Sequence, residues 1–120
     1  MESILTSVKR LLGIEEDYEA FDGELVLLIN STLSVLNQLG VGAEGYTIKD
    51  KSETWKDFLG EDTPFEAVKS YVYMKVRLLF DPPQSSAHIE SLNKLISEFE
   101  WRAYIHYDPV TTVAEPSDTV

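Results

Sequence analysis

A proline pair, Pro82-Pro83, constrains this chain more than any other feature, because it divides a long apolar stretch into two helices. A proline pair cannot supply helix hydrogen bonds, so the first helix must end at Phe80. Its start is also encoded. Thr63 can cap the helix, Pro64 suits the first position, and Glu66 completes a capping box.

The second helix is expected to begin at Ser85 or Ser86 and to run to about Tyr107, before Asp108-Pro109. The two helices would form an antiparallel pair. The first of them is nearly apolar all round, and two interpretations stay open. It is either a central helix surrounded by its own neighbours or a helix partly covered by another subunit. Its narrow polar strip consists of Glu66, Ser70, Tyr73 and Arg77, with Lys69 beside it.

Three further helices are expected upstream, over residues 2–12, 23–39 and 52–59, from apolar residues at helical spacing. Gly13 would end the first helix, and Asp22 would cap the second. Residues 41–52 have no helical period and could form a short β-hairpin arm. The predicted buried residues include two on which the helix pair depends, Leu79 and Phe99. The others named for the core are Leu28, Leu36, Val72 and Leu92, and Leu95 belongs to the apolar stripe of the last helix.

The fold class predicted from these patterns is all-α: a small bundle of four to five helices with an irregular arm and an extended C-terminal tail. Residues 1–107 would form the helical domain and residues 108–120 the tail. At 120 residues the chain is long enough for one domain with its own core. It has no cysteine, which excludes a disulfide framework and thiolate metal ligands. No signal peptide or membrane span is expected.

The formal net charge of −11 argues against a chain that grips nucleic acid, whose phosphates need Lys and Arg. Residues 1–48 carry two bases against eight acids. The charge could simply provide solubility, or it could form a surface past which DNA slides without adhering. A metal site is not expected, because the acids at 15–24 do not follow the calcium-loop pattern. His88 and His106 have no catalytic partner at a suitable spacing, so no enzyme, cofactor or catalytic residue is expected.

Trp101 and Ile105 lie four apart on the charged face of the last helix and predict a small apolar patch. The patch either binds a partner or is covered by the first helix or the tail. Leu27 also lies off its apolar stripe, among polar residues. The full set of candidate partner or subunit contacts is Leu27, Tyr73, Arg77, Trp101, Ile105, Tyr107, Val110 and Val113.

Several segments, in this order and spacing, resemble phage head–tail connector proteins. The similarity covers about residues 12–102 and is strongest at Val76-Arg77-Leu78-Leu79-Phe80-Asp81-Pro82-Pro83-Gln84-Ser85-Ser86. It does not include the tail after Tyr107. The other matching segments are Asp22–Leu25, Ile29–Ser31, Leu33–Gly42, Thr54–Leu59, Glu66–Val72 and Glu98–Arg102.

The resemblance implies a small helical adaptor of long-tailed phages, located in the virion and, during assembly, in the host cytoplasm. Such adaptors form a closed ring of roughly twelve copies beneath the portal protein. The ring extends the DNA channel and presents a surface to a stopper or tail-completion protein. DNA passes through without being specifically bound. Two alternatives stay open: a small cytosolic helical protein-binding or regulatory module that pairs through Trp101, and, last, an enzyme that uses the acidic cluster.

If the chain lines a DNA channel, some of its acids should face the lumen, where like charge prevents phosphate adhesion. The tail, rich in β-branched residues at 110–113, would dock on the portal protein or on a neighbouring subunit. The competing view of the tail is a dispensable end. The candidate channel-facing acids are Glu15, Glu16, Asp17, Glu19, Glu44, Glu61 and Asp62.

Overall fold

The computed structural model describes residues 2–61 and 65–107, with backbone only for residues 105–107. Within these ranges it contains five helices and no strand, which confirms the all-α fold class. The arm at residues 41–52 is an irregular loop rather than a β-hairpin. The helices are α1 (Ile4–Leu12), α2 (Asp22–Gln38), α3 (Trp55–Leu59), α4 (Phe65–Phe80) and α5 (Ser86–Tyr107).

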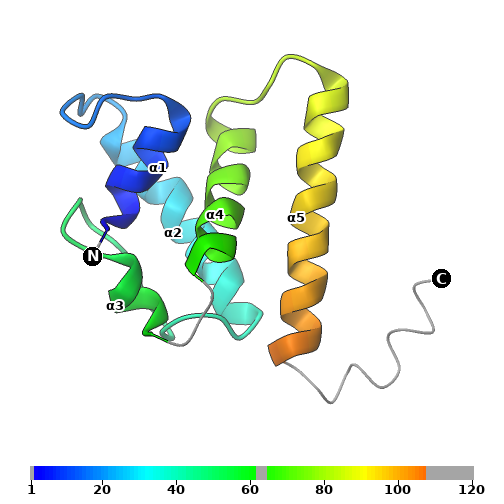
Figure 1. Cartoon of the computed structure of the whole chain (residues 1–120). Coiled ribbons are helices and arrows are strands. Elements are labelled where there is room, and N and C mark those ends of the chain that lie inside the picture. Colours follow the sequence, from blue (N-terminus) through cyan, green and yellow to red (C-terminus); the bar gives the residue numbers. More distant parts are fainter. Residues whose placement is uncertain (1, 62–64, 108–120) are drawn as a thin grey trace.

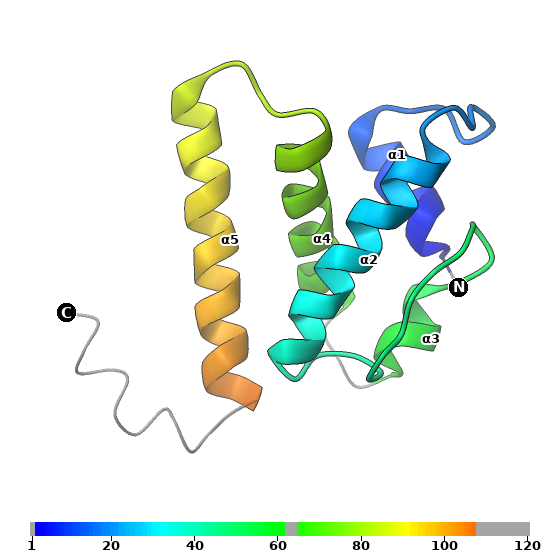
Figure 2. The ribbon, with the colours of Figure 1, turned by 180° about the vertical axis from the view of Figure 1, so that it is seen from behind.

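Helix α4 is the central element of the fold. It packs against α1, α2 and α5, with α1 and α2 to one side of it and α5 to the other (Figures 1 and 2). Helix α4 is therefore central within the chain, although Val68, Tyr71, Val72 and Val76 are its only buried residues among those described. Because α1 and α5 flank α4 on opposite sides, α1 does not cover the outer face of α5. The first helix is therefore not what covers Trp101, which was one of the two possibilities left by the sequence.

Several of the described helix ends follow local side-chain chemistry, whereas the predicted start of α4 at Thr63-Pro64 lies outside the described residues. Ser3 Oγ accepts a hydrogen bond from Thr6 N, and Gly13, at φ +83°, ends α1 in the left-handed conformation. The expectation that Asp22 caps α2 is wrong. The residue at the capping position is Phe21, which supplies no side-chain hydrogen bond. Asp22 instead forms an ion pair with Lys9, which competes for the same carboxylate.

The core lies between α2 and α4 and extends under α1 and α3. Its largest side chains, Trp55, Phe58 and Tyr71, are fully buried. Trp55 and Phe58 both belong to the short helix α3. The remaining apolar residues of α2 and α4 that are fully or almost fully buried are Leu25, Ile29, Leu33, Leu36, Val68, Val72 and Val76.

The predicted burial of Leu79 and Leu95 is wrong, because these side chains are 63% and 50% exposed. Leu79 belongs to the last turn of α4, where its helical face continues but the cover from neighbouring helices ends. Helix α5 packs mainly on α4, so only a narrow line of its stripe is buried. Of the other predicted core residues, Leu36, Val72 and Leu92 are buried, and Leu28 and Phe99 are partly buried.

Helix α5 is held against α4 by an aromatic stack and a polar contact. The Tyr71 and Phe99 rings stack with centroids 4.5 Å apart, and the Tyr71 hydroxyl donates to Glu100 Oε2 at 2.7 Å. Lys75 Nζ lies 3.7 Å from the same carboxylate. Burial, and secondarily the hydrogen bond to Glu100, raises the pKa of Tyr71 far above its ordinary value, so the hydroxyl remains a donor.

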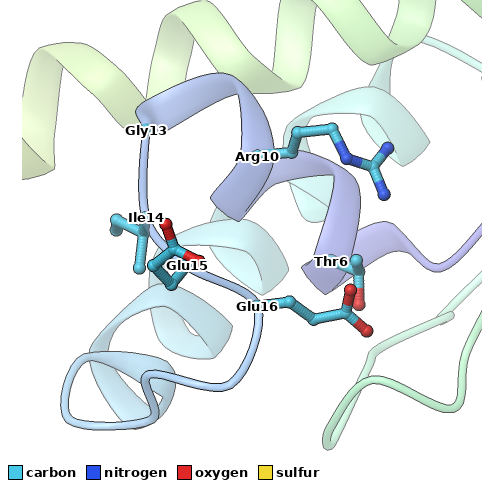
Figure 3. Close-up of a pocket in the computed structure, with 6 residues that line it drawn as sticks. All are labelled: Thr6, Arg10, Gly13, Ile14, Glu15 and Glu16. Atoms are coloured by element: carbon cyan, nitrogen blue, oxygen red, sulfur yellow. The ribbon is translucent and has the colours of Figure 1, made fainter.

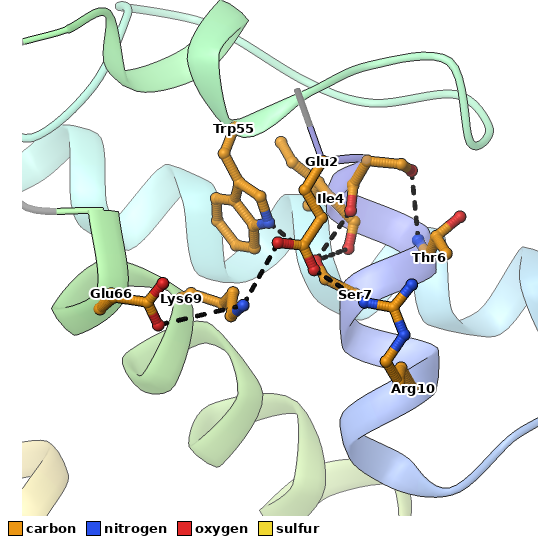
Figure 4. Close-up of polar contacts among 9 residues, drawn as sticks. Glu2, Ile4, Thr6, Ser7, Arg10, Trp55, Glu66 and Lys69 are labelled. Atoms are coloured by element: carbon orange, nitrogen blue, oxygen red, sulfur yellow. Dashed lines mark hydrogen bonds and ion pairs between the residues drawn. The ribbon is translucent and has the colours of Figure 1, made fainter.

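The chain's first residues are fixed to the segment before α3, a connection that the sequence did not predict (Figure 4). Ile4 N donates to Glu53 O at 3.0 Å, and Trp55 N donates to Glu2 O at 3.1 Å. In the core, Trp55 Nε1 donates to Ser7 Oγ at 2.7 Å. These bonds join α1 to α3 through both backbone and side chain.

Glu2 also connects α1 to α4 through its carboxylate (Figure 4). Its two oxygens lie 3.0 Å from Arg10 Nη1 and 3.3 Å from Lys69 Nζ. The Arg10 side chain is mostly exposed, so its pairing contributes little stability, whereas the Lys69 contact lies partly under the protein surface.

Candidate interaction surfaces

Four of the predicted acids share one exposed loop between α1 and α2. Glu15, Glu16, Asp17 and Glu19 all present their side chains to solvent there. With Lys51 they line a shallow depression of about 380 Å³. The loop lies at the same end of the molecule as the turn between α4 and α5 (Figure 1). It is the strongest concentration of negative charge among the predicted channel-facing residues.

The remaining predicted acids do not join this loop. Glu44 is exposed in the arm after α2, where it helps to line a polar hollow of about 530 Å³. Glu61 follows α3 and forms an exposed ion pair of 3.0 Å with Lys56. Asp62 lies outside the described residues. The end of α2 is far from the α1–α2 loop in both ribbon views (Figures 1 and 2). The seven acids therefore do not form one surface within a single chain.

The arm that carries Glu44 is held by two asparagines of α2, Asn30 and Asn37. Asn30 exchanges two hydrogen bonds with the backbone of Ile48, at 2.8 and 3.0 Å. Asn37 donates to Val41 O at 3.0 Å and to Ala43 O at 3.1 Å. Asparagine is unfavourable in a helix interior, and the two lie seven residues apart on one face, which is the signal that could have identified them.

A small pocket of about 330 Å³ opens beside α1 (Figure 3). It is lined by Thr6, Arg10, Gly13, Ile14, Glu15 and Glu16. Its charged groups are one arginine and two glutamates, which provide no nucleophile paired with a base. Among residues 2–61 and 65–107, no group of three or more His, Cys, Asp or Glu could hold a metal ion.

Helix α5 carries an aromatic pair that the sequence did not predict. Trp101 is half-buried and stacks on Tyr104, with ring centroids 6.3 Å apart and planes 28° apart. The partner predicted from spacing was Ile105, whose side chain lies outside the described residues, as does that of Tyr107. Val110 and Val113 are outside them entirely.

Tyr73 and Arg77 contact each other within the chain. Arg77 Nη1 donates to the Tyr73 hydroxyl at 2.9 Å, and both side chains are half-buried. Arg77 Nε is buried, and no described residue accepts a hydrogen bond from it. Leu27, in contrast, is 70% exposed on the outer face of α2, as its position off the stripe predicts.

Comparison with known proteins identifies the kind of molecule to which these surfaces belong. A family model described as "Phage connector protein" matches residues 4–110 of the 120. The chain belongs to the phage connector protein family. The match includes all five described helices and confirms the resemblance seen in the sequence. No curated protein and no solved structure gives a significant match.

Membership in this family gives the connector a structural role in a phage particle and indicates contact with portal and tail proteins in general. In the part of the connector that the structure describes, no helix is long and apolar enough to span a membrane.

Proposed function

We propose that this connector is a head–tail adaptor that forms a closed homo-oligomeric ring beneath the portal protein. The ring, of roughly twelve copies, would extend the DNA channel and link the capsid to the stopper or tail. The single observation that carries the proposal is the family match across residues 4–110. A ring needs two different surfaces on each copy, one for each neighbour.

Exposed apolar side chains support assembly with other chains. Leu27, Leu79 and Leu95 are each at least half exposed, although each lies on a well-packed helix. Single exposed leucines need no explanation, but the last two extend apolar stripes that are buried elsewhere along the same helices. Covering those stripes with neighbouring copies or with the portal protein would remove this surface from water.

The test is the size of the purified connector, alone and after mixing with the portal protein of the same particle. Light scattering should give a mass of many copies, and electron microscopy should show closed rings on the portal protein. A connector that stays monomeric under every condition, and fails to bind the portal protein, would contradict the proposal.

We further propose that the acidic loop at residues 15–19 faces the channel. Its four exposed carboxylates would repel DNA phosphates and so prevent adhesion during passage. Replacing Glu15, Glu16, Asp17 and Glu19 with their amides should slow genome passage in assembled particles while leaving ring mass unchanged. Tight, salt-sensitive binding of duplex DNA by the unmodified connector would count against a repelling surface.

A further inference from the structure

Lys9 is a buried lysine whose partners all come from one short segment. Its side chain is 3% exposed, and its Nζ donates to Glu16 O at 2.9 Å and to Tyr18 O at 2.8 Å. Asp22 Oδ1 lies 2.8 Å from the same nitrogen. That contact is an ion pair rather than a hydrogen bond, because no donor reaches Oδ1 with hydrogen-bond geometry.

Burying an ammonium group is unfavourable unless other groups replace its water. Here the replacement consists of two carbonyls from the loop and one carboxylate at the start of α2. The carbonyls of Glu16 and Tyr18 turn inward to Lys9, whereas the loop's acidic side chains stay exposed. Figure 3 shows Glu15 and Glu16 on this loop, beside α1.

The loop contains its own turns, but they lie at the surface. Tyr18 N donates to Glu15 O, and Asp22 N donates to Glu19 O, both at 3.1 Å. The side chains around these turns are exposed, so the turns alone leave their amides open to water. The bonds to Lys9 connect the backbone in the middle of the loop to the interior. At the end of the loop, the Phe21 ring also packs edge-on against Phe80 of α4, with centroids 5.2 Å apart.

We propose that Lys9 is an internal anchor that holds residues 14–21 as a rigid acidic strap between α1 and α2. Lys9 is a positioning residue, because it acts through the backbone of the strap and is itself inaccessible. The strap's carboxylates then occupy fixed positions instead of averaging over many. The anchor is a property of the single chain, and only its use toward DNA rests on the proposed function.

The first experiment uses the unaltered full chain and measures amide hydrogen exchange by NMR. The amides of Tyr18 and Asp22 should exchange on the order of tenfold more slowly than those of Asp50 and Ser52. The latter pair is the control, since both amides donate to carboxylates in an exposed turn, and the contacts that hold this turn are to Ile48 and Glu53 at its two ends. Equal exchange rates in the two loops would overturn the anchor.

The second experiment compares Lys9→Met/Asp22→Asn with Asp22→Asn alone. The double variant removes both buried charges and so avoids leaving one unpaired, while the single variant keeps both carbonyl contacts. The anchor predicts much faster exchange at residues 18 and 22 in the double variant and a clearly smaller change in the single variant. Equal loosening in both variants, or none in the double variant, would overturn the proposal.

Two controls make the result specific. Lys51→Met removes the lysine that faces the same acids from outside and should leave strap exchange unchanged. The amides of Val72 and Val76 in α4 report on whether the fold remains intact. Ring formation is measured separately from hydrogen exchange. A connector that forms rings but has a fast-exchanging strap would contradict the anchor alone. A connector that stays monomeric but has a slowly exchanging strap would contradict the proposed function alone.

Discussion

Gly42 and Tyr46 show how single residues fix the arm between α2 and α3. Gly42 has φ +83°, and a Cβ at this position would overlap the ring of Phe58. The Tyr46 ring packs against the same Phe58 ring, with centroids 5.4 Å apart. The arm is therefore set against a fully buried aromatic side chain, which itself belongs to α3.

Replacing Gly42 with alanine should destabilise the fold by about 2–4 kcal/mol, from a left-handed backbone and a steric overlap together. Gly45→Ala is the matched control, because Gly45 also has positive φ (+74°) but has nothing near a new Cβ. Its cost should be about 1 kcal/mol. Urea denaturation measures both values. Equal costs would show that Phe58 moves aside without penalty.

Tyr46 predicts a loss of stability at alkaline pH. Burial, with the nearby charges of Asp57 and Glu53, raises the pKa of Tyr46 to about 12. The folded chain holds the Tyr46 proton more tightly than the unfolded chain does. The resulting contribution to the free energy of unfolding is therefore fully present below pH 10 and is lost as the pH rises toward 12. Tyr46→Phe should flatten the fall in unfolding free energy over that range. At neutral pH it should cost little, since no described residue pairs with the buried hydroxyl.

At the scale of helices, the sequence predicted where most helices end better than it predicted which side chains a neighbouring helix covers. Gly13 and the proline pair are local signals, and each marks a helix end where the structure has one. Thr54, which caps α3, was not identified, and that helix was expected to begin three residues too early, at Ser52. The exposure of Leu79 depends on how far another helix extends over it, which its own periodicity does not encode. The spacing of apolar residues shows which face of a helix packs inward, but not how far along the helix a neighbouring helix covers that face.

The same limit applies to the candidate surfaces. The four acids of the strap are close because they are neighbours in sequence, whereas the positions of Glu44 and Glu61 depend on tertiary packing. The buried role of Lys9 was also missed, since a lysine in the last turn of a helix usually points to water. Its partners lie seven to thirteen residues away, beyond helical periodicity.

Two leucines provide a direct test of the packing. In the monomer, Leu36→Ala should cost about 2–5 kcal/mol, because Leu36 is fully buried in α2. Leu79→Ala should cost less than about 1 kcal/mol, because most of that side chain is already in water. Denaturation at a concentration where the chain is monomeric measures both. A large cost for Leu79→Ala would mean that α4 is covered further along than this structure shows.

At the scale of the whole molecule, the apolar core of the described residues extends along the chain from Ile4 to Ala103. Residues 108–120, predicted from the sequence to form a tail, lie outside the described residues. The tail carries four consecutive β-branched residues, Val110 to Val113, and no base. Such a segment suits an extended strand added to a partner's sheet edge.

Deleting residues 108–120 should therefore block attachment to the portal protein or a neighbouring subunit while leaving the unfolding free energy nearly unchanged. Thermal unfolding and particle yield measure the two effects. A Gly/Ser tail of the same length is the control, because it keeps chain length without the β-branched side chains. Normal yields of complete particles from the truncated chain would contradict the prediction that the tail docks on a partner.

The bonds between the first residues and the segment before α3 have a consequence for the order of folding during synthesis. Helix α1 leaves the ribosome first, yet its partners Glu53 and Trp55 are made about fifty residues later. The short helix is marginal alone, so it must wait without its final contacts until α3 emerges. The time needed to translate the middle of the chain thus sets when the N-terminal part reaches its native contacts. A pause in translation before Trp55 would prolong the interval in which the apolar face of α1 is accessible to other chains.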